Sequence, residues 1–382
     1  MKKIWKKRLA AAAVLTTVFS LSSTFPVATQ TAEAKADLNN IFDFEAHRGG
    51  RDARPENTLY SYTYAIEHGA TCIECDMQLT KDGQIVMSHN PVLNHDITRS
   101  KDGTYVPKGK YDIRKMTVSE LKQFDVGIMD KKTKYYKSHG SSQIEHTAKI
   151  PTLEELLQLI QQSGDKDVYL NIETKSYPDP VLGNIYKNSP NPQKFVETFN
   201  KIIKKYGMEN RVILQSFDWN TLRLMKKLNP NVSLSALWQQ QPSWGAGADR
   251  LRPLTPGKSP WLGGLDIDDF KGDPVAAAHA IGVDVVSPYY KEITQDQVNE
   301  AHSFGMKVVP WTVNSVKSMS MLYDMGVDGI ISDKPWLLRS FLEKRGAKLR
   351  PVHPFASKYH LDKDHQETPA NIKAEKALNA AY

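Results

Sequence analysis

Short runs of β-branched and apolar residues alternate with longer amphipathic stretches between about residues 41 and 332. Each run has the length and composition of a buried strand. The eight runs span residues 41–47, 72–79, 168–173, 211–217, 232–238, 284–288, 307–313 and 328–332. The stretches between them repeat their apolar residues with a helical period, and several end in Gly, as helices often do. These predicted helices span residues 56–69, 152–164, 193–207, 220–229, 273–282, 294–305 and 315–326.

Regular alternation of eight strands with helices predicts an α/β protein with the TIM (β/α)₈ barrel fold. A doubly wound open sheet is the alternative. Two connections, at about residues 80–150 and 239–270, are too long to be simple links. Both follow strands, so in a barrel both lie on the face that carries active sites.

The first long connection predicts a small insertion subdomain after the second strand, at about residues 90–150. The connection itself, from about residue 80, begins with a hairpin over residues 80–91, in which Asp82-Gly83 is the turn. The barrel then occupies residues 37–345. Residues 346–382 are polar and lack a helical period, so they are expected to form a C-terminal tail.

The N-terminus has the layout of a cleavable secretory signal peptide over residues 1–36. A Lys/Arg cluster precedes an apolar run from Leu9 to about Ala28, and small-residue cleavage sites follow at residues 32–36. A membrane anchor is the alternative, although the many Ser and Thr residues count against it. The prediction is a protein secreted to the cell envelope or medium, with no stable membrane insertion after cleavage.

Without residues 1–36 the chain carries 44 Lys or Arg and 42 Asp or Glu. This near balance does not suggest a nucleic-acid partner. The two cysteines, Cys72 and Cys75, lie three apart on a predicted strand and so point to opposite faces. We therefore expect packing roles for them and no disulfide between them.

The strand pattern predicts that three carboxylates lie close together. Glu74 and Asp76 leave the same face of the second strand, and Glu173 ends the next barrel strand. Because parallel barrel strands open toward one face, the three acids can converge there. An all-oxygen set with no Cys or His favours one hard divalent cation, Ca²⁺ or Mg²⁺, while solvated surface acids are the alternative.

Two histidines bracket this acidic pair. His47 closes the first strand and His89 closes the hairpin, and a histidine can both accept and donate a proton near neutral pH. Arg48 and Lys175 add positive charge where an anion could bind. Together these residues predict a site for a phosphate ester.

Several segments, in order and spacing, resemble the glycerophosphodiester phosphodiesterases over about residues 42–342. They are "AHRGGRDARPENT", "IECDMQLTKDGQIVMSHNPVLN", "LNIETK", "ILQSF", "VVPWTVN" and "GVDGIISDKP". The resemblance implies a TIM barrel with a small insertion, a bound divalent cation, and hydrolysis of glycerophosphodiesters to glycerol 3-phosphate and an alcohol.

The resemblance also implies roles for individual residues. His47 and His89 correspond to the general acid/base pair, and Glu74, Asp76 and Glu173 to the metal ligands. Arg48 and Lys175 correspond to residues that hold the phosphate, and Trp311 to one that lines the pocket against the glycerol. Asn90 departs from the family, which usually has Asp there, and a neutral partner would raise the pKa of His89 less.

The turn after the first strand suggests further roles. Gly49 and Gly50 would let the backbone approach a bulky anion closely. Asn57 suits a helix N-cap, and Glu56 beside it suits the positive end of the helix. For both residues we expect a structural role.

The sequence is compatible with more than one class of natural substrate. Deacylated phospholipids are one class, and glycerophosphate polymers such as teichoic acid are another. Lys131, Lys132, Lys134 and Lys137 could grip a polyanion or could be a solvated loop. Two other functions are considered. The first is a phospholipase D-type enzyme with Trp238, Trp244 and Trp261 as an apolar platform, and the second is a non-catalytic surface binding module.

Overall fold

Eight parallel strands form the centre of the protein. The structure is a computed structural model that describes residues 41–178, 191–240, 249–251, 257–362 and 368–382. The predicted signal peptide at residues 1–36 lies outside the described residues. The parallel strands are β1 (Asp43–Ala46), β2 (Cys72–Leu79), β4 (Tyr169–Thr174), β5 (Val212–Ser216), β6 (Ser233–Trp238), β7 (Val285–Pro288), β8 (Lys307–Val308) and β9 (Gly329–Ser332).

The order of the strands closes the sheet into a barrel. Their order is β8-β7-β6-β5-β4-β2-β1-β9, so the first and last strands are neighbours, with Asp43 opposite Gly329. Backbone hydrogen bonds of 2.9 Å, from Asp328 to Val308 and from Val313 to Ile331, join the β8 region to β9. The predicted TIM barrel is thus confirmed, and the open doubly wound sheet is wrong.

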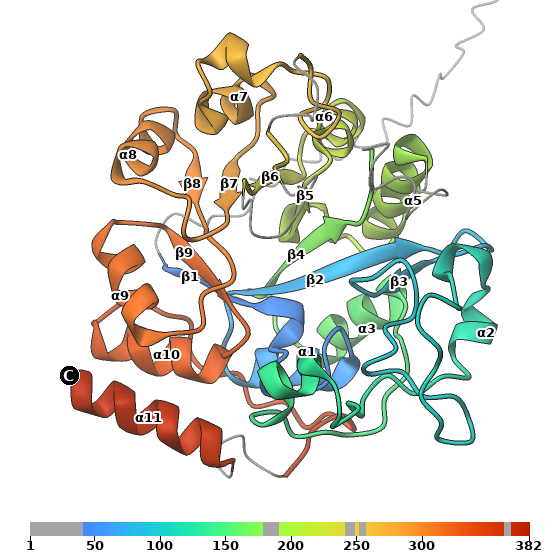
Figure 1. Ribbon diagram of the computed structural model, residues 1–382. Coiled ribbons are helices and arrows are strands. Elements are labelled where there is room, and N and C mark those ends of the chain that lie inside the picture. Colours follow the sequence, from blue (N-terminus) through green and yellow to red (C-terminus); the bar gives the residue numbers. More distant parts are fainter. Residues whose placement is uncertain (1–40, 179–190, 241–248, 252–256, 363–367) are drawn as a thin grey trace, which may run out of the picture. The chain divides into compact units, whose positions relative to one another are not determined.

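The helices pack around the outside of the strands (Figure 1). They are α1 (Leu59–Glu67), α3 (Leu153–Ser163), α5 (Pro192–Lys205), α6 (Trp219–Leu228), α7 (Pro274–Ala280), α8 (Gln295–Ser303), α9 (Val316–Asp324) and α10 (Pro335–Lys344). α3 illustrates why they form: Thr152 and Glu155 cap its start reciprocally, and Gly164 ends it at φ 69°. Its five apolar residues are buried against the barrel.

The insertion follows β2 and packs beside the barrel (Figure 1). It begins with β3 (Ile85–Met87), which pairs antiparallel with β2 across the predicted turn. Short helical turns follow at η2 (Ile113–Lys115), α2 (Val118–Leu121) and η3 (Tyr136–Gly140). Nine buried residues, including Leu93, Ile113 and Phe124, form a hydrophobic cluster separate from the main core.

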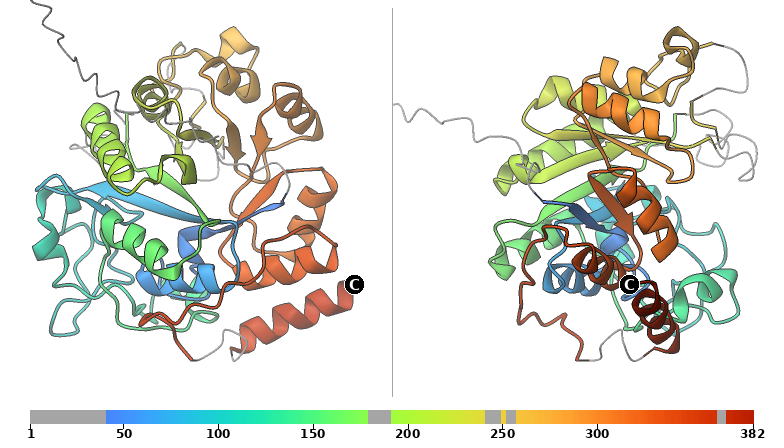
Figure 2. Two further views of the ribbon diagram at one scale, coloured as in Figure 1. Left: turned by 180° about the vertical axis from the view of Figure 1, so that it is seen from behind. Right: turned by 90° about the vertical axis from the view of Figure 1, so that its left-hand side faces the viewer.

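The C-terminal residues differ from the expected tail. Residues 369–381 form α11 (Pro369–Ala381), which lies beside α10 (Figures 1 and 2). Leu378 is 1% exposed and belongs to the main core, while Asn371 is fully buried. The helical period is weak in the sequence because only Asn371 and Leu378 of α11 are buried. Within the described part of the chain, no helix has the length and hydropathy needed to cross a membrane.

Candidate active site

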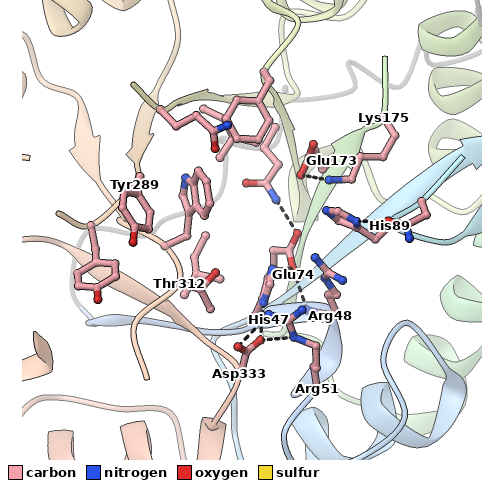
Figure 3. Close-up of a pocket in the computed structure, with 18 of the residues that line it drawn as sticks. His47, Arg48, Arg51, Glu74, His89, Glu173, Lys175, Tyr289, Thr312 and Asp333 are labelled. Atoms are coloured by element: carbon pink, nitrogen blue, oxygen red, sulfur yellow. Dashed lines mark hydrogen bonds and ion pairs between the residues drawn. The ribbon is translucent and has the colours of Figure 1, made fainter. Parts of the chain in front are cut away.

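A cavity of about 810 Å³ opens at the carboxyl ends of the barrel strands, where active sites of this fold lie. Figure 3 shows this cavity, whose labelled charged groups come from β2 and β4 and from the segments that follow β1, β3, β4 and β9. Every parallel strand of the described barrel contributes to the lining, with residues at or after its end in all strands but β2, which contributes Glu74 from within the strand. The barrel therefore brings together residues that are far apart in the sequence.

The three predicted carboxylates converge as expected. Glu74, Asp76 and Glu173 are all buried, and one ligand oxygen of each lies within 4.8 Å of the others. Burial raises the pKa of Glu74 well above its ordinary value and that of Glu173 to about 7. Three carboxylates so close together repel one another unless positive charge is added.

Part of that charge comes from Lys175. Its Nζ lies 2.9 Å from Asp76 Oδ1 and 2.7 Å from Glu173 Oε2. Burial opposes ionisation of Asp76, but Lys175 and the other nearby cationic groups hold its pKa well below the ordinary value. Since the remaining donors are buried oxygens only, the trio fits a hard divalent cation better than zinc.

The imidazole of His47 is held on its Nδ1 side by Asp333, which directly follows β9. Its Nδ1 lies 2.5 Å from Asp333 Oδ1, and its Nε2 is 3.8 Å from Glu74 Oε2. Arg51 Nε and Nη2 donate to the same Asp333 carboxylate at 2.8 and 3.0 Å. The imidazole is therefore fixed with Nε2 toward the acidic trio, as Figure 3 shows. Burial lowers the pKa of His47 to about 4 in spite of Asp333.

His89 is oriented by its neighbour. Its Nδ1 lies 2.7 Å from Asn90 Oδ1, so the amide holds the ring although it carries no charge. Burial lowers the pKa of His89 well below the ordinary value, and Arg48 and Lys175 lower it further. The Asn at position 90 thus still positions the imidazole and leaves its Nε2 available.

Arg48 bridges the acids and the first turn. Its backbone N–H donates to Glu74 Oε2 at 2.8 Å, and its Nη1 donates to Glu56 at 3.0 Å. Its Nε lies 3.4 Å from Asp76 Oδ2. Both Arg48 and Lys175 line the cavity, which leaves two cationic groups beside the trio. This arrangement can hold a phosphate anion next to a divalent cation.

Comparison with known proteins identifies the type of site. Residues 47–337 match the Glycerophosphoryl diester phosphodiesterase family. The chain belongs to this family. A glycerophosphodiester phosphodiesterase from Caldanaerobacter subterraneus subsp. tengcongensis is 31% identical over 79% of this chain and 98% of its own length. One from Bacillus subtilis is 28% identical over 76% and 83%, respectively.

Solved structures agree with this assignment. A structure from Silicibacter pomeroyi, assigned to the glycerophosphoryl diester phosphodiesterases, is 28% identical and has a TM-score of 0.69. The match covers 81% of this chain and 96% of that one. The protein is therefore a phosphodiesterase with the TIM barrel of its family.

The turn between β1 and α1 differs from the roles expected for Asn57 and Glu56 at the start of the helix. Thr58, not Asn57, caps α1, and it does so reciprocally with Ser61. Asn57 has φ 51°, and its amide instead bonds Asp76, donating from Nδ2 at 2.9 Å and accepting the backbone N–H at 3.2 Å. Asn57 thus orients an acid of the trio, and Glu56 holds Arg48.

The two glycines are also explained by packing. A Cβ at Gly49 would lie 2.5 Å from Ser61 Oγ, and one at Gly50 would lie 2.7 Å from Pro335 Cγ. Both residues have positive φ, 79° and 102°. Gly is required at both positions because α1 and α10 approach closely and because the backbone has positive φ. The expected close approach of an anion stays a prediction.

The opposite wall of the cavity is aromatic. Trp311 lines it as predicted, donates from Nε1 to the Ser287 carbonyl at 2.8 Å, and packs edge-on against Phe217 at 5.5 Å. The ring centroids of Tyr289 and Trp311 lie 5.6 Å apart. Trp238 and Trp261 are 1% and 3% exposed, so they do not form an exposed platform. Trp244 lies outside the described residues.

Four residues of the site were not assigned from the sequence. Asp333 and Arg51 hold His47, while His139 and Tyr135 come from the insertion. His139 Nδ1 lies 2.6 Å from Asp52 Oδ1, and the Tyr135 hydroxyl donates to Glu56. Asp333 follows the last strand in "ISDKP", a position that could have marked it. Nothing in the local pattern marks the two insertion residues.

Proposed function

We propose that the protein hydrolyses glycerophosphodiesters to glycerol 3-phosphate and an alcohol, with a divalent cation and two histidines. The observation that carries the proposal is the placement of the buried trio Glu74, Asp76 and Glu173 between His47 and His89. Ligand binding alone does not call for two histidines around three acids. The names of the relatives support the substrate class.

The trio would hold the cation, Ca²⁺ or Mg²⁺, which when bound polarises the phosphoryl oxygens and neutralises developing charge. Arg48 and Lys175 bind the phosphate, and Trp311 borders the alcohol portions. Because Asp333 and Asn90 occupy the Nδ1 atoms, each histidine has its Nε2 available for proton transfer. One takes a proton from the attacking group, which is either water or a glycerol 2-hydroxyl whose cyclic phosphate is then opened by water. The other gives a proton to the leaving oxygen as the P–O bond breaks.

Burial keeps both histidines neutral near pH 7, which suits the one that acts as a base. The acid must start protonated. The negative charge of the bound diester favours the imidazolium form beside it. Substrate binding therefore prepares the second histidine for its role.

Release of glycerol 3-phosphate from glycerophosphocholine tests this function. We expect release by the wild-type protein with added Ca²⁺ or Mg²⁺, loss of release with EDTA, and a fall of about 10³-fold or more in kcat for His47→Ala. His353→Ala is the matched control, since this histidine bonds the Ser163 carbonyl away from the cavity. Release that resists EDTA or survives in His47→Ala would contradict the proposal.

We further propose that residues 1–36 direct secretion, as their sequence layout predicts. The mature N-terminus of protein recovered from the medium or envelope tests this, because cleavage is expected between residues 32 and 37. Lipid-cleaving activity of the phospholipase D type is less favoured, since Trp238 and Trp261 are buried.

A further inference from the structure

The insertion supplies a third histidine to the cavity. His139 belongs to η3 and lines the cavity together with Ser138. Its side chain is 14% exposed, and its Nδ1 lies 2.6 Å from Asp52 Oδ1. Within the described part of the chain, its Nε2 has no hydrogen-bond partner. The cavity is therefore bordered by an oriented imidazole that has one nitrogen available.

The same arrangement occurs at His47, where Asp333 holds Nδ1 and leaves Nε2 for the reaction. The two His–Asp pairs are neighbours. A side-chain N or O atom of Asp52, one of His139 and one of Asp333 all lie within 4.8 Å of one another. The backbone N–H of Asp52 also donates to the Asp333 carbonyl at 3.0 Å. A carboxylate on one ring nitrogen fixes the direction of the other nitrogen, so both imidazoles are set for a definite contact.

The histidine is held on a second side by Tyr135. The ring centroids of Tyr135 and His139 lie 4.8 Å apart. The Tyr135 hydroxyl donates to Glu56 and accepts from Arg51 Nη1 at 3.3 Å. Contacts to the turn after β1 thus fix both residues, and His139 keeps a constant place in the cavity.

The charges around the His139–Asp52 pair favour an imidazolium partner for the acid. Asp52 is 2% exposed, and a buried carboxylate requires a nearby opposite charge. Lys334 Nζ lies 3.7 Å from Asp52 Oδ2, beyond hydrogen-bond distance, whereas His139 is in hydrogen-bond contact. The titratable and charged groups around this pair are Asp333, Lys334, Arg51, Tyr135 and Glu56.

The imidazole stands at an end of the cavity where the other cation is already bonded. Figure 3 shows His47, Arg51 and Asp333 at one end and Lys175 at the other. Arg51 donates from Nε and Nη2 to Asp333 and from Nη1 to the tyrosine hydroxyl described above. His139, which lies beside Asp333, can therefore offer a donor to a bound anion at this end.

We propose that His139, as an imidazolium fixed by Asp52, donates a hydrogen bond from Nε2 to an anionic oxygen of the substrate phosphate. This inference rests on the proposed function, because the phosphate is that of the diester to be cleaved. The negative charge of the diester favours the charged imidazole beside it. His139 exchanges no proton with the reacting atoms, so it contributes to KM and leaves kcat nearly unchanged.

Two variants at position 139 test this role with glycerophosphocholine as the substrate. H139Q keeps a neutral N–H donor but loses the positive charge. We expect its KM to rise about tenfold at about pH 6, with kcat within about twofold of wild type. H139K restores a positive charge, so its KM should return to within about threefold of wild type. A normal KM in H139Q, or no rescue in H139K, would contradict the proposal.

The pH dependence separates charge from shape. An imidazolium loses its proton as the pH rises, so the ratio of the H139Q KM to the wild-type KM should shrink between about pH 6 and 9. Titration of His47 and His89 affects both proteins alike and cancels in this ratio. H139K should keep its advantage over H139Q at about pH 9, because an ammonium stays charged there. A ratio that is constant with pH would mean that His139 has only a structural role.

The matched control is H95Q. His95 Nε2 lies 3.3 Å from Asp96 Oδ1, so it is another His–Asp pair of the insertion, but it does not line the cavity. H95Q should keep the wild-type KM at every pH. Equal rises in KM for H95Q and H139Q would overturn the inference.

A second measurement separates this inference from the proposed function. If the wild type cleaves no glycerophosphodiester, the proposed function fails, and isothermal titration with glycerol 3-phosphate decides the inference. The affinity should be about tenfold weaker in H139Q than in the wild type at about pH 6. Equal affinities, or no binding by either protein, would show that His139 does not bind the phosphate.

Discussion

At the scale of single residues, the site combines groups that a strand pattern reveals with groups that only folding brings together. Glu74, Asp76 and Glu173 could be predicted because side chains two apart on a strand share a face and barrel strands share an open end. Asp333 could not be paired with His47 in this way, because 286 residues separate them. The strand pattern gives positions along the chain but no hydrogen-bond partners.

Asp333 is a positioning residue for His47. In Asp333→Asn we expect kcat to fall about 10²-fold or more with a smaller change in KM, because the amide no longer fixes the imidazole with Nε2 toward the trio. Steady-state kinetics on glycerophosphocholine measure the split. Asp328→Asn, at the other end of the same barrel region, should keep near wild-type kcat. A normal kcat in Asp333→Asn would rule out this role.

Gly49 is required by both its backbone and its neighbour. Gly49→Ala places a methyl group against Ser61 at φ 79°, so we expect a loss of about 2 kcal/mol or more in the free energy of unfolding. Gly83→Ala is the control, because its φ of 74° is similar but no atom lies within 4 Å of the added Cβ. It should cost about 1 kcal/mol. Equal losses in urea titrations would show that packing against Ser61 does not matter.

At the scale of elements, periodicity located all eight barrel strands, while the irregular elements were harder to predict. β8 ends at Val308, earlier than the predicted 313, as the chain reaches Pro310, which has no N–H to donate. The segment around Tyr135 and His139 was expected to be either a polyanion grip or a surface loop. Its inward face depends on partners at residues 52 and 56, which local sequence cannot reveal.

Helix α11 contributes to stability through a narrow buried stripe. Leu378→Ala should lower the free energy of unfolding by about 2–3 kcal/mol, because Leu378 is 1% exposed within the main core. Ile372→Ala on the same helix is the control, since Ile372 is 40% exposed, and it should change stability by less than about 1 kcal/mol. Thermal or urea unfolding measures both. Similar small effects would mean that α11 does not dock in solution.

At the scale of the whole molecule, an ion pair ties the chain after α10 to the loop between α3 and β4. Arg350 Nη2 donates to both oxygens of Asp165 at 2.6 Å, and both residues are buried. Burial alone would raise the pKa of Asp165, but the bonds from Arg350 outweigh it and hold the pKa below the ordinary value. The C-terminal part of the protein is thus anchored by a charged contact as well as by α11.

This pair predicts a pH dependence of stability. A carboxyl whose pKa is lowered by folding stabilises the protein above its unfolded pKa of about 3.9, and the contribution is lost as pH falls through the folded pKa. Asp165→Asn should therefore lower stability by about 3 kcal/mol at pH 7. The difference from wild type should shrink below about pH 4. A difference that stays constant from pH 7 to 3 would contradict the assignment.

The pairing of β1 with β9 also bears on protein synthesis. A ribosome must add 286 residues after His47 before Asp333 exists to hold it. A nascent chain, or one cut short by a premature stop codon before β9, contains the acidic trio and both histidines but cannot close the barrel. Hydrolytic capacity therefore arises only when translation is nearly finished, and truncated products are expected to be inert.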